Sequence, residues 1–292
     1  MNKCLLITNP LSGKYSRKKA EFIVNELGRC GITVLKHELG VDEKVSDVIK
    51  NIDAKDINHI ILAFGDGTIN NACNALLARD DYEKFVISVM PLGTANILAM
   101  ELNCDSIKRS IRAINNFYNN IGKTKKIHFG LVNGQYFVLM ASAGFDSYAV
   151  RNTKESLKKK IGKYAYIYEF LKIVFKKDFR KVSATVDGVR YDGIVACVSN
   201  GKYYGIKLHI TASDMSTNDF DLLVIKKISL ISMIKYLFTK KSNRDIIYIK
   251  NVNRVIMDSE IKEYPLQIDG DYLCDLPSTV ESTNKFLNFI RL

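Results

Sequence analysis

The sequence lacks several features that would assign it quickly to a class of protein. No apolar run approaches the roughly 18 residues that a membrane-spanning helix needs, and the run from Cys4 to Thr8 is too short for a signal peptide. The six cysteines show no CxxC spacing, and the four histidines form no metal-ligand pattern. We therefore expect a cytoplasmic protein with reduced, mostly buried thiols and no histidine-based metal site.

The composition that is present is that of a globular protein with an excess of positive charge. The chain has 292 residues, of which 47% are hydrophobic and 25% charged, which is enough for one large or two ordinary domains. The formal net charge of +12 favours anionic partners such as nucleotides, nucleic acid or an acidic membrane surface. Because no nucleic-acid-binding module is recognisable, we expect no nucleic-acid partner.

The residue pattern of the chain changes near residue 121. Residues 1–121 alternate between strand-like and helix-like segments, which predicts a Rossmann-like α/β domain with a parallel sheet covered on both faces. Residues 122–292 contain short runs of β-branched and aromatic residues, separated by turn signals such as Asn133-Gly134 and Asp187-Gly188. These predict an all-β antiparallel sandwich or barrel, and the last run, 285–291, is compatible with a return to the first domain.

The stretch 60–102 carries one pattern twice. An apolar run ends at Gly65-Asp66-Gly67-Thr68, a second ends at Pro91-Leu92-Gly93-Thr94, and a helix-like segment follows each turn. Backbone N–H groups at a helix start attract anions, glycine lets a large anion approach, and Thr68 and Thr94 can cap a helix or donate to phosphate. Asp66 among such groups indicates a metal-nucleotide site; as an alternative, both segments are ordinary capped turns.

A third junction of this kind lies at the start of the chain. Asn9-Pro10-Leu11-Ser12-Gly13 follows the apolar run 4–8, and it is not a P-loop because GxxxxGK[ST] is absent. The carboxyl ends of neighbouring parallel strands meet at one edge of a sheet, so we expect the loops to face one crevice.

These motifs resemble those of the diacylglycerol kinase catalytic family. NPxSG, GDGTxN and PxGTxNxxAxxL occur in order within the first 102 residues, and Gln267-Ile268-Asp269-Gly270-Asp271 follows near the C-terminus. The similarity is greatest to the bacterial soluble lipid kinases, which include sphingosine-kinase-like relatives. It implies an NAD kinase/diacylglycerol kinase-like α/β domain followed by a β-sandwich. The implied reaction transfers the γ-phosphoryl group of ATP, with Mg²⁺, to the hydroxyl of a membrane lipid, diacylglycerol being the default.

The resemblance also implies roles for individual residues. Asp66 would act through Mg²⁺, and Asp271 would accept the proton of the lipid hydroxyl in place of the family's glutamate, one methylene shorter. The family's acidic metal-binding segment is reduced here, which leaves Asp214 and Asp219 as metal candidates. The residues expected to hold the nucleotide are Asn9, Pro10, Leu11, Ser12, Gly13, Gly65, Asp66, Gly67, Thr68, Ile69, Asn70, Asn71 and Thr94.

Two further departures from the family pattern are visible. Phe64 replaces a glycine before Gly65, so the backbone there must tolerate a Cβ atom, and Asn71 stands where an acid is common. Two other functions stay open beside a lipid kinase of different substrate, such as a sphingosine-like base. One is an NAD kinase, which shares the GDGT turn. The other is a catalytically weak nucleotide-binding peripheral membrane protein, which the departures at Asn71, Asp271 and Thr217 suggest.

Two helix-like segments interrupt the second domain. Segment 156–175 is amphipathic, and residues 151–181 carry eleven basic and three acidic side chains. It predicts either a lipid-facing helix on an anionic membrane or a packed helix with solvated charges. Segment 228–238 is interpreted as a helix that packs its apolar side, with a lipid-facing helix as the alternative. We expect peripheral association with the inner face of the cell membrane, and the resemblance makes a homodimer plausible.

Overall fold

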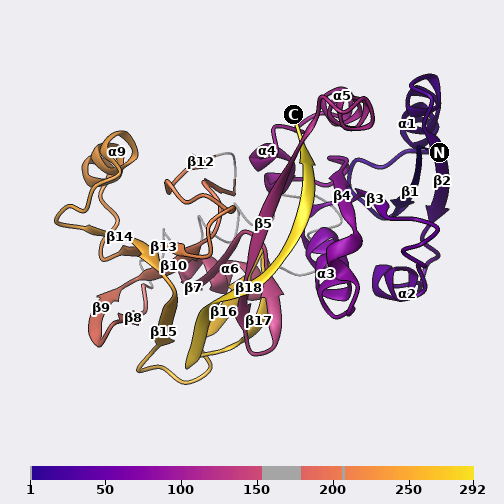
Figure 1. The fold of residues 1–292 in the computed structure, drawn as a ribbon. Helices are drawn as coiled ribbons and strands as arrows, with labels where there is room; N and C mark the ends of the chain where they lie inside the picture. The colour runs from indigo at the N-terminus through magenta and orange to yellow at the C-terminus, as the bar shows by residue number, and fades with distance from the viewer. Residues whose placement is uncertain (1, 153–178, 206–207) are drawn as a thin grey trace. The chain divides into compact units, whose positions relative to one another are not determined.

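The computed structural model describes residues 2–152, 179–205 and 208–292 (Figure 1). Contacts divide the chain into two compact units, unit 1 (Met1–His128 with Lys285–Leu292) and unit 2 (Phe129–Asn284). The contact boundary therefore falls a few residues after the predicted one at 121, and the end of the last strand belongs to unit 1. The predicted helix 156–175 lies outside the described residues.

Unit 1 is built around a parallel sheet. Its strands lie in the order β2-β1-β3-β4, and the end of β18 adds a further parallel strand beside β4. The predicted α/β fold is confirmed. Its elements are β1 (Lys3–Thr8), α1 (Arg17–Arg29), β2 (Thr33–Glu38), α2 (Val45–Lys50), β3 (His59–Ala63), α3 (Asp66–Leu77), the 3₁₀ helix η1 (Tyr82–Lys84), β4 (Val86–Val89), α4 (Ile97–Glu101) and α5 (Ile107–Tyr118).

The helices of unit 1 bury one apolar side each against this sheet. Ser16 and Ser106 cap α1 and α5 by accepting a backbone N–H of the first turn, at 3.3 Å in both helices. Ile23 and Leu27 of α1 and Ile114 of α5 enter one core with the sheet. Figure 1 shows α1 and α5 on one face of the sheet and α2 and α3 on the other, which explains why every residue of β3 is buried.

Unit 2 is a sandwich of antiparallel strands, as predicted. One sheet has the order β14-β13-β10-β7-β16-β17, and the other pairs the start of β18 with β15, β8 and β9. Its elements are β5 (Lys123–Val132, which begins in unit 1), β6 (Gln135–Phe137), β7 (Met140–Gly144), α6 (Phe145–Asn152), β8 (Val182–Val186), β9 (Val189–Gly193), β10 (Val195–Ser199), β11 (Tyr203–Tyr204), β12 (Leu208–His209), β13 (Phe220–Ile225), α9 (Leu230–Thr239), β14 (Ile246–Val252), β15 (Arg254–Asp258), β16 (Pro265–Ile268), β17 (Asp271–Asp275) and β18 (Ser278–Arg291).

The core of unit 2 lies between these two sheets. Alternating residues of facing strands meet there, such as Ala141 and Leu266 from one sheet and Val255 from the other. The turn signals identified in the sequence form two-residue hairpins with positive φ at both positions, 48° and 79° at Asn133-Gly134 and 49° and 78° at Asp187-Gly188. Local turn chemistry therefore sets the register of these strand pairs.

The interpretation of segment 228–238 as a helix that packs its apolar side is wrong. The helix is present as α9, but on the side expected to pack, Leu230 is 75% and Ile234 46% exposed, and the residue that the helix buries is Tyr236. The reason is that polar groups fix the orientation of the helix: the Ser232 hydroxyl bonds to Asp245, and the Tyr236 hydroxyl bonds to the carbonyl of Ile210. In the described part of the chain, no helix is long and apolar enough to cross a bilayer.

Candidate active site

Three loops of unit 1 meet where β1, β3 and β4 end. The backbone N–H of Lys14 donates to the carbonyl of Leu92 at 2.9 Å, which joins the first loop to the third. A Cβ atom built on Gly13 would lie 3.2 Å from Oγ1 of Thr94. The structure thus brings together the loops that the sequence predicted, and we call residues 9–14, 65–68 and 92–96 the three-loop site.

The second and third loops touch through two glycines. A Cβ atom on Gly93 would lie 2.1 Å from Cα of Gly65, and a Cβ atom on Gly65 would lie 3.1 Å from Cα of Gly93. Real side chains do not approach backbone atoms at 2.1 Å, so Gly93 is required for this contact. Phe64, which replaces the family's glycine, is fully buried and lies outside the residues with positive φ, so its Cβ atom is tolerated.

Asp66 connects the second loop to the start of α4. Its carboxylate accepts the backbone N–H groups of Ile97 at 3.0 Å and Leu98 at 3.1 Å. Burial raises the pKa of Asp66, and these N–H bonds oppose the rise. The carboxylate thus caps the otherwise unpaired N–H groups at the start of α4, one of the two roles that the sequence left open for Thr94.

Asn96 is a site residue that the sequence reasoning missed. It adopts a left-handed conformation with φ of 56°, and its side chain accepts the N–H of Gly93 at 2.8 Å and donates to the carbonyl of Gly93 at 3.0 Å. These bonds shape the third loop and leave Thr94 exposed before the helix. Two signals in the sequence point to this role: asparagine adopts this conformation more readily than most residues, and Asn96 is the asparagine of the PxGTxNxxAxxL motif.

The first loop is held by Asn9. Its side-chain oxygen accepts the N–H of Leu11 at 2.8 Å, and its carbonyl accepts the N–H of Ser12 at 3.0 Å. This is a turn closed by the side chain of its first residue. Pro10 and Leu11 are therefore turned out to solvent, and Leu11 is 77% exposed.

Helix α3 supplies the remaining predicted nucleotide contacts. It begins at Asp66 after Gly65, and no side chain caps it, so Gly67 and Thr68 lie in its open first turn. Ile69 points into the core at 1% exposure, and Asn70 is buried and accepts from Asn74. The side chains of Ile69 and Asn70 are therefore covered by protein, while Asn71 is exposed.

The C-terminal motif forms the hairpin between β16 and β17. Asp269 and Gly270 make its two-residue turn with φ of 50° and 90°, and Asp271 is the exposed first residue of β17. The Asp269 carboxylate accepts three backbone N–H groups, from Val138 and Leu139 at 2.8 Å and from Met140 at 2.9 Å. Asp269 therefore ties the hairpin to the loop before β7.

A buried polar chain lies behind this hairpin. Gln267 Nε2 donates to the Ser142 hydroxyl at 2.7 Å, Ser142 donates to Asp146, and the Tyr204 hydroxyl donates to the same Asp146 oxygen at 2.8 Å. Burial raises the pKa of Asp146, and the bonds from the two hydroxyls oppose it.

The direction of these hydrogen bonds determines how the side-chain amide of Gln267 is oriented. Asp146 accepts from Ser142, so the Ser142 oxygen is left to accept from the Gln267 amide. The amide oxygen of Gln267 then faces the N–H of Gly270, which it accepts at 2.7 Å. This series of hydrogen bonds from Asp146 to Gln267 thus holds the turn immediately before Asp271. It could not be predicted from the sequence, because its members lie far apart along the polypeptide.

The metal candidates Asp214 and Asp219 lie on one loop of unit 2. The Asp214 carboxylate accepts the N–H of Ser216 at 3.1 Å, and the Thr217 hydroxyl donates to Asp219 at 2.5 Å. Among the residues that the structure describes, no group of three or more His, Cys, Asp or Glu side chains could hold a metal ion. A metal at Asp214 and Asp219 stays a prediction.

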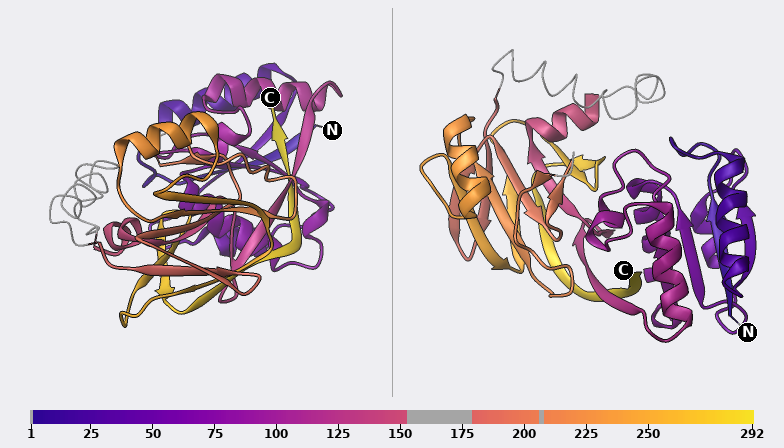
Figure 2. Two further views of the ribbon diagram at one scale, coloured as in Figure 1. Left: turned by 90° about the vertical axis from the view of Figure 1, so that its left-hand side faces the viewer. Right: turned by 90° about the horizontal axis from the view of Figure 1, so that it is seen from above.

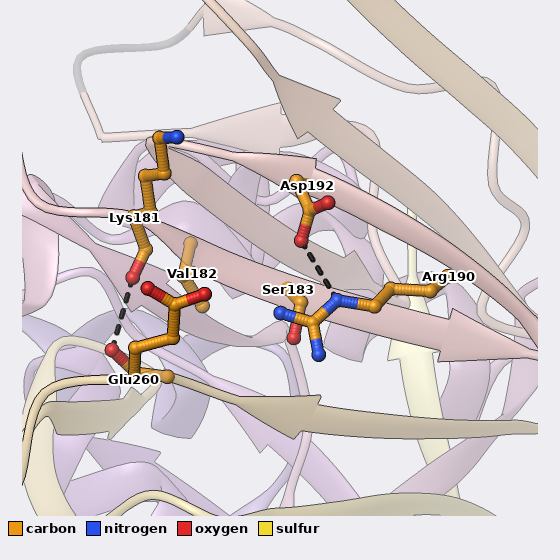
Figure 3. Close-up of a pocket in the computed structure, with 7 residues that line it drawn as sticks. Lys181, Val182, Ser183, Arg190, Asp192 and Glu260 are labelled. Atoms are coloured by element: carbon orange, nitrogen blue, oxygen red, sulfur yellow. Dashed lines mark hydrogen bonds and ion pairs between the residues drawn. The ribbon is translucent and has the colours of Figure 1, made fainter.

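A surface hollow on unit 2 shares no residue with any of these motifs. Figure 3 shows the Arg190 side chain directed at Asp192, and Nε of Arg190 lies 2.9 Å from Oδ1 of Asp192. Glu260 also lines the hollow. Arg190 and Asp192 pair with each other within β9, and we assign the hollow no part in the reaction.

Comparisons with known proteins agree with these motifs. Residues 3–131 match the model of the diacylglycerol kinase catalytic domain, and residues 140–291 match the YegS C-terminal NAD kinase β-sandwich-like domain. The chain is 28% identical to a diacylglycerol kinase of Bacillus subtilis, with 100% of this chain and 95% of the relative covered. It is 25% identical to a diacylglycerol kinase of Staphylococcus carnosus, with 94% and 90% covered.

A solved structure shares the fold. A putative diacylglycerol kinase from Bacillus anthracis matches with a TM-score of 0.80 at 21% identity, covering 100% of this chain and 97% of that one. The two family models together span nearly the whole chain and meet at the junction where its α/β and all-β parts join. The chain therefore belongs to the diacylglycerol kinase family and is a lipid kinase.

Proposed function

We propose that this kinase transfers the γ-phosphoryl group of ATP to the hydroxyl of diacylglycerol and so forms phosphatidic acid. The observation that carries the proposal is the convergence of the three loops at the carboxyl ends of β1, β3 and β4, which is where open α/β sheets bind ligands. The relatives named diacylglycerol kinase, which align over nearly their whole length, support the choice of acceptor.

The nucleotide would bind at the three-loop site. The open first turn of α3 offers N–H groups and a positive dipole end to phosphate oxygens, and Gly13 and Gly65 leave room for them. Lys14 is exposed beside Gly13 and would add a positive charge. Mg²⁺ bound with the nucleotide would neutralise charge on the transferring group. Because Asp66 is bonded to α4, we assign it the positioning of these two loops, with any contact to Mg²⁺ made through water.

The acceptor hydroxyl would lose its proton to Asp271. A general base of this kind contributes roughly 10²–10⁴ to the rate. Asp271 is exposed at the start of β17, and the bonds of Asp269 and Gln267 fix the turn that precedes it. Aspartate is one methylene shorter than the glutamate of the family pattern, so this fixed backbone position is what would set the reach of the carboxylate.

The enzyme would act at the inner face of the cell membrane, where its acceptor lies. The excess of 43 basic over 31 acidic residues favours a surface of anionic phospholipid. The resemblance also leads us to expect a homodimer, and size-exclusion chromatography with light scattering would measure the oligomeric state.

The test is transfer of labelled phosphate from ATP to a panel of acceptors in mixed micelles. The panel contains diacylglycerol, phosphatidylglycerol, ceramide, sphingosine and a polyprenol, with NAD in a separate aqueous reaction. Labelled phosphatidic acid, lost in an Asp66→Ala variant, is the expected result. Labelling of another lipid would change the acceptor, and labelling of NAD alone would refute a lipid acceptor. ATP binding without labelling of any acceptor would favour a catalytically weak protein.

A further inference from the structure

Helix α9 of unit 2 carries a line of exposed apolar side chains. Leu230, Ile231, Ile234 and Phe238 are 75%, 81%, 46% and 87% exposed, and we call these four residues the outer stripe. Leu230, Ile234 and Phe238 are four residues apart, and Ile231 lies beside them, so they share one face of the helix. A contiguous apolar patch of this kind on a soluble unit marks an interaction surface.

The outward direction of the outer stripe is fixed by bonds on the opposite side of α9. Tyr236 is fully buried, and its ring packs edge-on against Tyr248 with centroids 5.6 Å apart. The Asn243 side chain donates to the carbonyl of Ser232 at 2.9 Å, and Ser232 in turn bonds to Asp245. Figures 1 and 2 show α9 beside β14 at an end of unit 2, and no described element covers its outer side. The stripe is therefore exposed because α9 is held in this orientation, and not because the helix is locally unfolded.

Positive charge surrounds the outer stripe. Residues 226–245 contain six basic side chains against the single acid Asp245. Lys226 and Lys227 precede the helix, Lys235 lies on it next to the stripe, and all three are exposed. Arg244 and Lys227 line a hollow at the same end of the helix.

The apolar stripe and the positive charge around it together indicate the kind of partner that binds α9. A partner must offer apolar surface to the stripe and negative charge around it, which a bilayer of anionic phospholipid does at every point of its surface. A second copy of this chain would bring the same lysines face to face, and that repulsion disfavours a dimer through α9.

We propose that α9 docks this enzyme onto an anionic membrane. The outer stripe enters the boundary between headgroups and acyl chains, and Lys226, Lys227 and Lys235 lie among the lipid phosphates. The proposal deepens the proposed function, on which it rests, because it names the surface by which the kinase reaches a membrane-embedded acceptor.

The test is sedimentation of the full chain with sucrose-loaded vesicles, made of phosphatidylcholine alone or with phosphatidylglycerol. An Ile231→Ser/Phe238→Ser variant is expected to lower the partition coefficient by about tenfold or more on the anionic vesicles. The matched control is Val41→Ser/Ile121→Ser, which changes side chains of unit 1 that are 87% and 72% exposed and leaves binding unchanged. Lys226→Gln is expected to weaken binding about fivefold on anionic vesicles only.

Two results would overturn the docking proposal. One is a stripe variant that sediments with anionic vesicles as the wild type does. The other is a wild-type dimer that the stripe variant converts to a monomer, because the occupant would then be a second copy. Phosphotransfer to diacylglycerol dissolved in detergent micelles separates this proposal from the proposed function. The stripe variant should keep full activity there, whereas a wild type that binds vesicles but labels no lipid in micelles would refute the function and leave the docking intact.

Discussion

Replacing Gly93 by alanine is expected to push apart two of the loops that form the three-loop site. The new Cβ atom would lie 2.1 Å from Cα and 2.8 Å from N of Gly65, and 2.8 Å from Oδ1 of Asn96. The first two are backbone atoms that no rotamer change can move away. Ordinary contact needs about 3.4 Å or more, so the loops must separate by more than about 1 Å.

The magnitude follows from that displacement. A misplacement of about 1 Å at a site that positions reacting groups costs on the order of 100-fold in rate. Overpacking of this kind costs about 1–3 kcal/mol of stability, which a folded kinase survives. We therefore expect Gly93→Ala to remain folded, to bind ATP more weakly and to lose about 100-fold in kcat/KM.

The assay combines ATP affinity by calorimetry, phosphotransfer in micelles and Tm by circular dichroism. Gly28→Ala is the control, because a Cβ atom there in α1 meets nothing within 4 Å. Gly13→Ala is expected to fall between the two, since its Cβ atom would meet the Thr94 hydroxyl at 3.2 Å, and a hydroxyl can rotate away. A Gly93→Ala enzyme with the ATP affinity and rate of Gly28→Ala would refute the reasoning.

Three further substitutions probe buried and half-buried polar groups. In Asp146→Asn the new amide can donate to Ser142 and so reverse the hydrogen bonds that orient Gln267. We expect kcat to fall about tenfold with KM for ATP unchanged, in stopped-time assays across pH 6–9. Normal kcat in that variant would contradict the ordering of donors. Asp269→Ala leaves three N–H groups unpaired and should lower the free energy of unfolding by about 3 kcal/mol or more in urea titrations, a loss below about 1 kcal/mol being the contrary outcome. His59 is buried with its pKa lowered to about 3, so the unfolded chain binds a proton below pH 6.5 that the folded chain does not. The free energy of unfolding should therefore fall by about 2 kcal/mol from pH 7.5 to pH 5. His59→Gln should remove most of this fall, and an unchanged pH dependence of the urea midpoint in that variant would contradict the prediction.

The elements that could be predicted from the sequence are those set by neighbouring residues. Alternation of apolar runs with Gly turns gave the parallel sheet of unit 1, and Asn133-Gly134 and Asp187-Gly188 gave hairpins because their conformations require positive φ. The Cys4 and Cys197 thiols are buried and free, as expected of reduced cysteines.

The partners of the site residues could not be predicted, because they depend on how distant segments meet. Asp66 bonds to N–H groups some thirty positions away on α4, and the contact exists only because β3 and β4 are neighbours in the sheet. The sequence therefore suggested a metal role for Asp66 and either a cap or a phosphate contact for Thr94. In the structure, Asp66 caps α4 and Asn96 shapes the third loop.

The orientation of α9 was also beyond the sequence. Its apolar residues recur at helical spacing, which in most soluble proteins indicates a buried face. The face that packs is decided instead by the hydroxyl bonds of Ser232 and Tyr236, whose partners, Asp245 and Ile210, lie on other segments of unit 2. A helix with two competing faces cannot be oriented from periodicity alone.

The central claim is that a carboxylate at the start of β17 takes the proton while ATP is held at the three-loop site. The direct measurement is transfer of labelled phosphate from ATP to diacylglycerol in micelles by Asp271→Asn and Asp271→Glu. Asp187→Asn serves as control, since it changes an exposed turn of the same unit. We predict that Asp271→Asn loses about 100-fold or more in kcat with ATP affinity unchanged, and that Asp271→Glu retains activity. Full activity of Asp271→Asn would contradict the claim.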